Sequence, residues 1–149
     1  MDLRSAIPSL LPLAIEWAQA ASCEAAEAGV ALNDDGERLA RRVGVRFPER
    51  IRVAVVDALP LPPHPLLRQA ALENGVLGPS GAGLTLGHTV FVRRGVESRR
   101  LLSHEFRHVF QYEEAGSIAA FLPRYLEQIA EYGYANAPLE IDARDHEVE

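Results

Sequence analysis

Two histidines four residues apart, with a glutamate beside the first, form the group in this chain best suited to chemistry. His104, Glu105 and His108 make a His-Glu-x-x-His pattern within Leu101–Tyr112, a segment with the apolar spacing of a helix. Residues four apart lie on one face of a helix, so both imidazoles can reach the same zinc ion (Zn²⁺). Glu105 adjoins that face and can reach a water at the open coordination position. The pattern predicts a site for metal-assisted hydrolysis.

A surface helix that carries solvated histidines and a solvated glutamate is the alternative interpretation, and the flanking residues count against it. No proline or glycine interrupts residues 97–115, Ser98 or Ser103 can cap the start, and Gly116 is a stop signal. The segment also has the apolar stripe of a packed helix, formed by Leu101, Leu102, Phe106, Val109 and Phe110. We therefore expect a packed helix that holds the histidines in place.

A catalytic zinc usually has three protein ligands, so a third ligand is expected after His108. Asn136, followed two residues later by proline, marks a helix start and places Glu140 in the first turn of that helix. The intervening chain is long enough for one antiparallel helix, expected over Ser117–Tyr132. His146 is the rival ligand, but it lies in a charged terminal segment that can fray. We predict Glu140 as the third ligand.

The pattern His104-Glu105-x-x-His108, followed by Glu140 and Ala143, resembles that of the gluzincin metallopeptidases. Small minigluzincin-like bacterial proteins and the family that includes the prenyl-protein peptidases are especially similar. The resemblance implies a zincin-like fold and a zinc-dependent metallopeptidase that hydrolyses peptide bonds. It agrees with the assignment of the two histidines and Glu140 as ligands and of Glu105 as the general base.

Weaker features extend this resemblance over Gly81 to about Arg144. Gln111 resembles the His-x-x-Gln continuation of small predicted peptidases, and an apolar strand within 83–92 precedes the helix. Arg144 departs from the prenyl-peptidase pattern, in which aspartate often follows the alanine. The chain also lacks the apolar runs of those membrane enzymes, so their membrane-embedded activity does not carry over.

Peptide hydrolysis also needs a donor to the oxyanion that develops on the scissile carbonyl. The sequence leaves this donor open among four residues, which are His88, Tyr112, Tyr132 and Tyr134. Tyr134 is attractive because it lies just before the helix of Glu140. A substrate strand could also pair with the edge of the sheet, where free backbone groups give affinity without strict sequence choice. The expected partner is therefore a peptide or protein.

Two functions of other classes remain open. One is a non-catalytic zinc-stabilised interaction domain, whose site would be closed to water and whose Glu105 would be engaged elsewhere. The other is a metal-free interaction module with a degenerate site. The net charge of −6 argues against a nucleic-acid partner. The single Cys23 and an N-terminal segment that lacks a basic start favour a cytoplasmic protein.

The elements that must position these residues predict an α+β fold in one domain. A helical region over about 1–45 is expected to precede a catalytic core over about 46–149, in which a small sheet packs against the active-site helix and two C-terminal helices. The expected elements are helices over Leu10–Ala31, from Asn33 or Asp34 through Val43, and over Leu66–Glu73, strands over Ile51–Val56 and Leu86–Arg93, a proline-rich loop over 59–65 and a turn cluster over 78–83.

Overall fold

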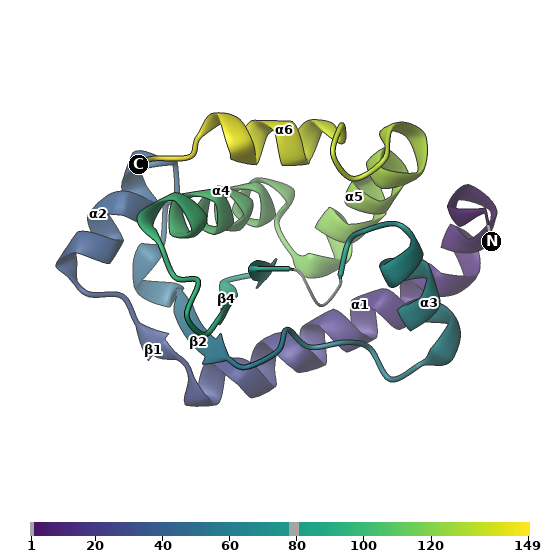
Figure 1. Cartoon of the computed structure of the whole chain (residues 1–149), viewed down its shortest axis with the longest axis horizontal. Helices are drawn as coiled ribbons and strands as arrows, with labels where there is room; N and C mark the ends of the chain where they lie inside the picture. The colour runs from purple at the N-terminus through teal and green to yellow at the C-terminus, as the bar shows by residue number, and fades with distance from the viewer. Residues whose placement is uncertain (1, 78–80) are drawn as a thin grey trace.

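A computed structural model describes residues 2–77 and 81–149 and has an α+β fold (Figure 1). The elements within these ranges are α1 (Leu3–Ala28), β1 (Val30–Ala31), α2 (Asp34–Arg42), the 3-10 helix η1 (Pro48–Arg50), β2 (Arg52–Val56), α3 (Pro65–Glu73), β3 (Gly83–Leu86), β4 (Thr89–Arg93), α4 (Arg99–Ala115), α5 (Ile118–Tyr132) and α6 (Pro138–Asp145). None of these helices combines the length and apolar character of a bilayer span.

The four strands form one sheet in the order β1-β2-β4-β3. β2 and β4 are parallel, whereas β1 pairs with β2 and β3 pairs with β4 in antiparallel fashion. Successive side chains of a strand point to opposite faces, so Val90 and Val92 lie on one side of β4 and Phe91 on the other. Helix α1 runs below the sheet in Figure 1, while α4 lies above it with α6 on top.

Each face of the sheet therefore has its own hydrophobic core. The α2 core consists of Leu39, Ala40, Val43, Val45, Ile51, Val90, Val92, Phe106 and Val109. The α1 core consists of Leu3, Leu10, Ala14, Ala18, Leu67, Ala70, Leu86, Phe91, Tyr112, Phe121, Leu122, Tyr125, Ile129 and Ala137. Helix α4 contributes to both cores, which fixes its position relative to the sheet.

The first helix is longer at its start than the sequence predicted. It begins at Leu3 rather than near Leu10 and continues through Pro8 and Pro12. Both prolines lie on the exposed face, where water can bond the carbonyl groups that lose a helical partner. The apolar stripe of the helix is buried in the α1 core and outweighs those losses. The helix also ends earlier, at Ala28, because the chain enters the short strand β1.

The predicted strand over Leu86–Arg93 is confirmed over Thr89–Arg93, which is β4, but its start is wrong, because the chain forms a hairpin turn there. β3 ends at Leu86, and Gly87 takes a φ of +67° in the turn that leads into β4. Glycine adopts this conformation without steric cost. β4 is consequently internal, and the edge strand beside α4 is β3. The hypothesis of an edge that pairs with substrate therefore transfers to β3.

The C-terminal elements follow the prediction closely. Ser98 and Ser117 cap α4 and α5 through hydrogen bonds to the backbone N–H groups of Leu101 and Ala120. Helix α6 begins at Pro138, one residue after its cap, and its first turn contains Glu140 as expected. Part of the predicted turn cluster, residues 78–80, lies outside the described residues.

Candidate metal centre

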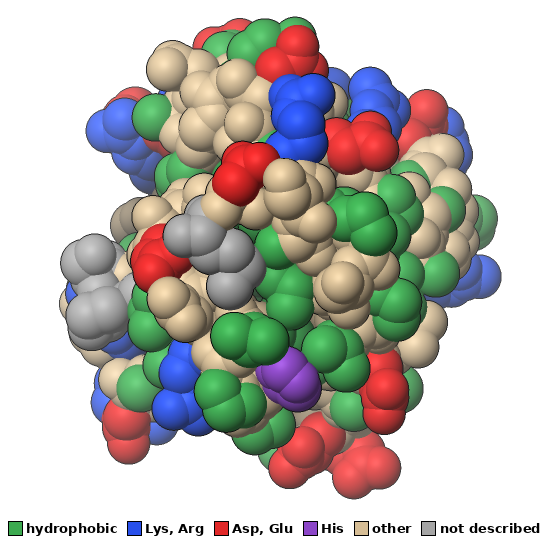
Figure 2. Space-filling model, turned by 90° about the vertical axis from the view of Figure 1, so that its right-hand side faces the viewer, with side chains coloured by type: hydrophobic (Ala, Val, Ile, Leu, Met, Phe, Trp, Pro, Cys, Tyr) green, Lys and Arg blue, Asp and Glu red, His purple; other side chains and the backbone are tan. Residues whose placement is uncertain are grey.

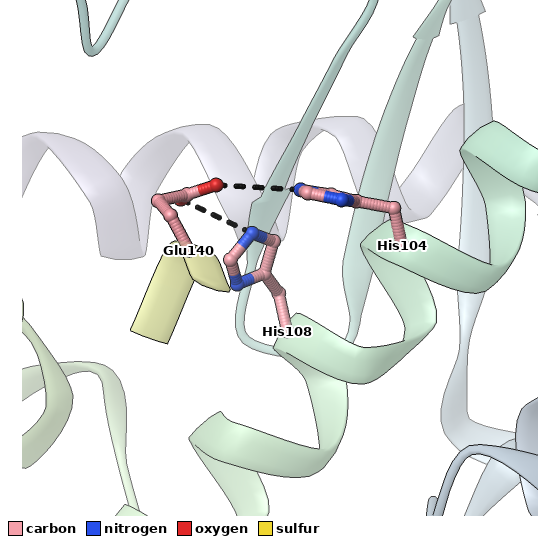
Figure 3. A group of neighbouring side chains, drawn as sticks. All are labelled: His104, His108 and Glu140. Atoms are coloured by element: carbon pink, nitrogen blue, oxygen red, sulfur yellow. Dashed lines mark ion pairs between the residues drawn. The ribbon is translucent and has the colours of Figure 1, made fainter. Parts of the chain in front are cut away.

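Helices α4 and α6 bring the three predicted metal ligands together. His104 and His108 occupy adjacent turns of α4, and Glu140 lies opposite them in the first turn of α6 (Figure 3). Phe106 and Val109, on another face of α4, are 0 % exposed in the α2 core and hold the helix in register. The side chains of the three residues point toward one another, as the His-Glu-x-x-His spacing requires.

The distances within this cluster suit a small cation. His104 Nε2 lies 3.3 Å from Glu140 Oε1, and His108 Nε2 lies 3.2 Å from Glu140 Oε2. Ligand atoms about 2.0–2.1 Å from a tetrahedral metal lie roughly 3.3–3.4 Å apart. One ligand atom from each residue falls within 4.8 Å of the others. The three residues therefore could hold a metal ion.

One carboxylate oxygen of Glu140, Oε1, forms an ion pair with His104 but no hydrogen bond with a described residue. The side chain is 2 % exposed, and its Oε2 accepts a hydrogen bond of 2.8 Å from the hydroxyl of Tyr125. Its Oε1 has no hydrogen-bond partner among the residues that the structure describes. A buried carboxylate oxygen without a hydrogen bond is costly. A cation between the two imidazoles would remove that cost, so the donor set fits a metal.

The outer nitrogen of each imidazole is also occupied. His108 Nδ1 donates to Gln111 Oε1 at 2.8 Å, and the amide of Gln111 in turn donates to Leu139 O and Asp142 Oδ2, each at 2.9 Å. His104 Nδ1 lies 2.8 Å from Glu147 Oε2. Hydrogen bonds of this kind place the proton of the neutral imidazole on Nδ1, so that the unprotonated Nε2 faces the cluster.

The charges of the cluster are strongly coupled. Burial lowers the pKa of both imidazoles, but the Glu140 carboxylate outweighs burial and raises them, that of His108 to about 9. Burial raises the pKa of Glu140, yet the two imidazoles outweigh it and hold this pKa well below its usual range. The carboxylate is therefore ionised at neutral pH and offers a negative charge to any bound cation.

Glu105 lies beside the cluster but is not part of it. Its Oε1 accepts a hydrogen bond of 2.8 Å from the Thr85 hydroxyl on β3, and burial raises the pKa of its carboxyl group. A Cβ on Gly83 would lie 3.0–3.1 Å from the carboxyl end of this side chain, so only glycine leaves it full room. Strand β3 thus positions Glu105 as well as forming the edge of the sheet.

Two cavities meet at Glu105. The first, called the cleft here, has a volume of about 850 Å³ and is also lined by His104, Glu147 and Arg100. The second, called the apolar pocket, has a volume of about 120 Å³ and reaches His108 and Glu140 from the side of α1. The cleft thus borders the cluster at His104, the pocket borders it at His108 and Glu140, and Glu105 belongs to both walls.

The four candidate oxyanion donors lie in different places. Tyr134 lines both cavities, and Tyr112 is buried with its ring stacked 3.8 Å from that of Phe121. Tyr132 is 48 % exposed, and His88 pairs with Glu113 at 2.9 Å. Of the four, Tyr134 alone lines the cleft among the described residues.

Sequence reasoning missed several residues of the site. Tyr125, Thr85 and Gly83 come from three separate elements, and no spacing in the sequence links them to the histidines. Nor does any spacing link Glu147, in the charged terminal segment, to His104. His146, the rival ligand, instead points its Nδ1 at the carbonyl of Asp142 at 2.7 Å. Only contacts between distant segments identify these roles.

Compared with protein-family models, with curated proteins and with solved structures, the chain matches none of them. Any function therefore has to be argued from the geometry of the residues themselves.

Proposed function

We propose that the protein is a zinc-dependent metallopeptidase, with His104, His108 and Glu140 as zinc ligands and Glu105 as the general base. Two imidazoles and one carboxylate are a common ligand set of catalytic zinc, which keeps a fourth position for water or substrate. Imidazole nitrogen also suits zinc better than the harder cations, which prefer oxygen. Bound zinc would supply an acidified water and polarise the scissile carbonyl.

The observation that carries the proposal is the position of Glu105. Its carboxylate is 5 % exposed, adjoins the cluster without belonging to it, and forms part of the cleft wall. Burial raises its pKa, which strengthens its carboxylate as a proton acceptor. A purely structural zinc site has no need for a fourth buried acid at this place.

The remaining residues supply orientation. Thr85 donates to Oε1 of Glu105, and no residue in the described ranges donates to Oε2, which can accept a proton from the attacking water. The hydroxyl of Tyr125 fixes Glu140, whereas Tyr134 lines the cleft and is suited to donate to the developing oxyanion. The leaving amine would receive its proton from Glu105.

A non-catalytic zinc domain is the main alternative, and the cleft argues against it. Such a site is closed by four protein ligands. Here three ligand residues face one another, and a cavity of about 850 Å³ is lined by His104 and Glu105. That volume lies within the range of small-molecule and peptide sites, roughly 300–1,000 Å³.

The experiment compares the wild type with Glu105→Gln after both are loaded with zinc. Glu105→Gln should retain one zinc per chain and cleave a mixed peptide library about 10²- to 10⁴-fold more slowly, because the base is lost. Glu127→Gln, on the exposed side of α5, is the matched control and should cleave like the wild type. Equal cleavage by Glu105→Gln and the wild type would remove the proposed mechanism. Absence of bound zinc in the wild type would remove the metal.

A further inference from the structure

The apolar pocket is built largely from one stripe of α1. Its wall includes Leu3, Ile7, Leu10, Ala14, Trp17 and Ala18, which recur at helical spacing over about 22 Å of the helix. Residues of helices α3 and α5 and of strand β3 also line it, and so do Glu105, His108 and Glu140. Figure 2 shows hydrophobic side chains gathered on the face of the molecule where α3 and the start of α1 lie. The pocket therefore joins an apolar wall to the proposed reaction centre.

Three small side chains create the space in this pocket. Ala14, Ala18 and Ala70 all line it, and each is less than 9 % exposed, so larger residues at these positions would occupy its interior. Closely packed cores contain few voids larger than a water molecule. A space of about 120 Å³ that is lined by buried side chains and adjoins a proposed catalytic group is therefore unusual for a core that serves stability alone.

The size and lining of the pocket define what it can hold. A cavity of about 150 Å³ lined by aliphatic and aromatic residues stays dry and binds benzene. The present volume of about 120 Å³ thus suits one side chain of the size of leucine, methionine or phenylalanine. A charged side chain would lose its hydration there, because the wall away from the cluster is apolar.

The cleft differs in chemistry and complements the pocket. Its wall includes the polar residues Ser98, Arg100 and Glu147, together with Gly83 at the start of the edge strand β3. An extended backbone can lie along such an edge while one side chain points away from it. Gly83 and Glu105 line both cavities, so a residue whose backbone lies at Glu105 has the pocket within reach.

From these observations we infer that the pocket binds one large apolar side chain of a peptide, that of a residue adjoining the scissile bond, and so sets the cleavage preference. This inference rests on the proposed peptidase function. Peptides with leucine, methionine or phenylalanine at that position are substrates, whereas those with glycine, aspartate or lysine are poor ones. Ala14 and Ala70 determine specificity through the room that they leave.

Cleavage of a peptide series that varies the residues on both sides of one bond tests the preference. The wild type should cleave the leucine peptide roughly 10- to 100-fold faster than the glycine peptide, judged by kcat/KM. Ala14→Leu should fill the pocket and reduce that ratio to near one. Ala20→Leu, on the exposed side of the same helix, is the matched control and should keep the wild-type ratio. If Ala14→Leu fails to fold, Ala70→Leu fills the pocket from α3 instead.

Binding measurements separate this inference from the peptidase proposal. The zinc-loaded protein should bind N-acetyl-leucine hydroxamate roughly 10- to 100-fold more tightly than N-acetyl-glycine hydroxamate, and Ala14→Leu should abolish the difference. Cleavage without any side-chain preference would overturn the inference and leave the peptidase intact. A binding preference without cleavage would uphold the pocket and overturn the peptidase. Crystals of the metal-free protein under xenon pressure should contain xenon in the pocket, and its absence there would overturn the inference in every case.

Discussion

The two cores lie on opposite faces of one sheet and differ in how completely they are filled. In the α2 core, Ala40, Val90, Val92, Phe106 and Val109 are each 0 % exposed. The α1 core contains more residues, yet it borders the apolar pocket of about 120 Å³. The α2 core thus excludes solvent at its centre and is called the filled core below, whereas the α1 core borders a space.

Helix α4 explains why this difference matters for the site. Phe106 points into the α2 core, while its neighbour Glu105 and the proposed ligand His108 line the apolar pocket. The filled core holds α4 from one side, while Glu105 and His108 face the apolar pocket on the other side. A rigid scaffold next to a vacant volume is the arrangement that a binding site needs, because a ligand can enter without displacing the groups that bind it.

The largest effect is expected from emptying the filled core. Phe106→Ala should lower the free energy of unfolding by about 3–5 kcal/mol, because a fully buried ring is lost and its cavity does not collapse completely. Phe47→Ala, at a ring that is 40 % exposed, is the control and should cost less than about 1 kcal/mol. Urea unfolding monitored by circular dichroism measures both. Equal costs would show that the α2 core is no better packed than the surface.

Enlarging a side chain should change the free energy of unfolding by different amounts in the two cores. Ala40→Leu inserts methyl groups into the filled α2 core and should cost about 1–3 kcal/mol. Ala14→Leu adds the same atoms beside the pocket and should be close to neutral, or stabilising by up to about 1 kcal/mol. Thermal unfolding of the metal-free proteins compares the pair. Equal destabilisation by both substitutions would mean that the α1 core has no space to fill.

The filled core is also the part of the molecule that the sequence predicted best. The β-branched residues of β2 and β4 and the apolar stripe of α4 follow simple periodicities, and those elements lie close to where the patterns put them. The three residues of the cluster were predictable for the same reason, since His104 and His108 share a helix and Glu140 follows a strong helix start.

The rest of the fold depended on contacts that no local pattern reveals. Gly87 interrupts an apolar run without any other turn signal, so β3 and β4 were predicted as one strand. The exposure of Pro8 and Pro12, which allows α1 to begin early, is decided by tertiary packing. The pocket could not be predicted either, because it depends on which small residues of α1 and α3 face one another.

Raising the pH should lower the stability of the metal-free protein through the cluster, whereas the contribution of the filled core should not depend on pH. His108 has a pKa of about 9 in the folded chain against about 6.5 when unfolded, so its proton stabilises the folded state. That stabilisation is fully present below about pH 6.5 and is lost as the pH rises through about 9. The raised pKa of His104 acts in the same direction.

Thermal unfolding in the presence of a chelator measures this dependence, and the Tm should fall between about pH 6.5 and 9. Glu140→Gln removes the carboxylate that raises both pKa values, so its Tm should depend much less on pH in this window. Phe106→Ala, by contrast, should lose the same free energy at every pH. A Tm of the wild type that rises with pH would contradict the charge pattern of the cluster.

The smallest expected effect tests whether the filled core also reaches the cluster through the C-terminal segment. Val148 packs against the α2 core, and its backbone N–H donates to Ser103 Oγ at 2.8 Å. This anchor places Glu147 where its carboxylate accepts a hydrogen bond of 2.8 Å from His104 Nδ1. If this C-terminal anchor positions the His104 imidazole, the hydrogen bond to Glu147 should contribute to metal affinity, although Glu147 is not itself a proposed ligand.

Glu147→Ala should therefore weaken zinc binding by roughly tenfold, the lower end of what outer hydrogen-bond partners of ligand histidines contribute. Glu147→Gln keeps an oxygen acceptor and should weaken binding less, which a role in packing alone would not predict. Glu149→Gln, at a side chain that is 89 % exposed, is the control and should bind zinc like the wild type. Competition with a chromophoric chelator measures the three affinities. Wild-type affinity in Glu147→Ala would mean that His104 is oriented by α4 alone and that the influence of the filled core on the cluster ends at the helix.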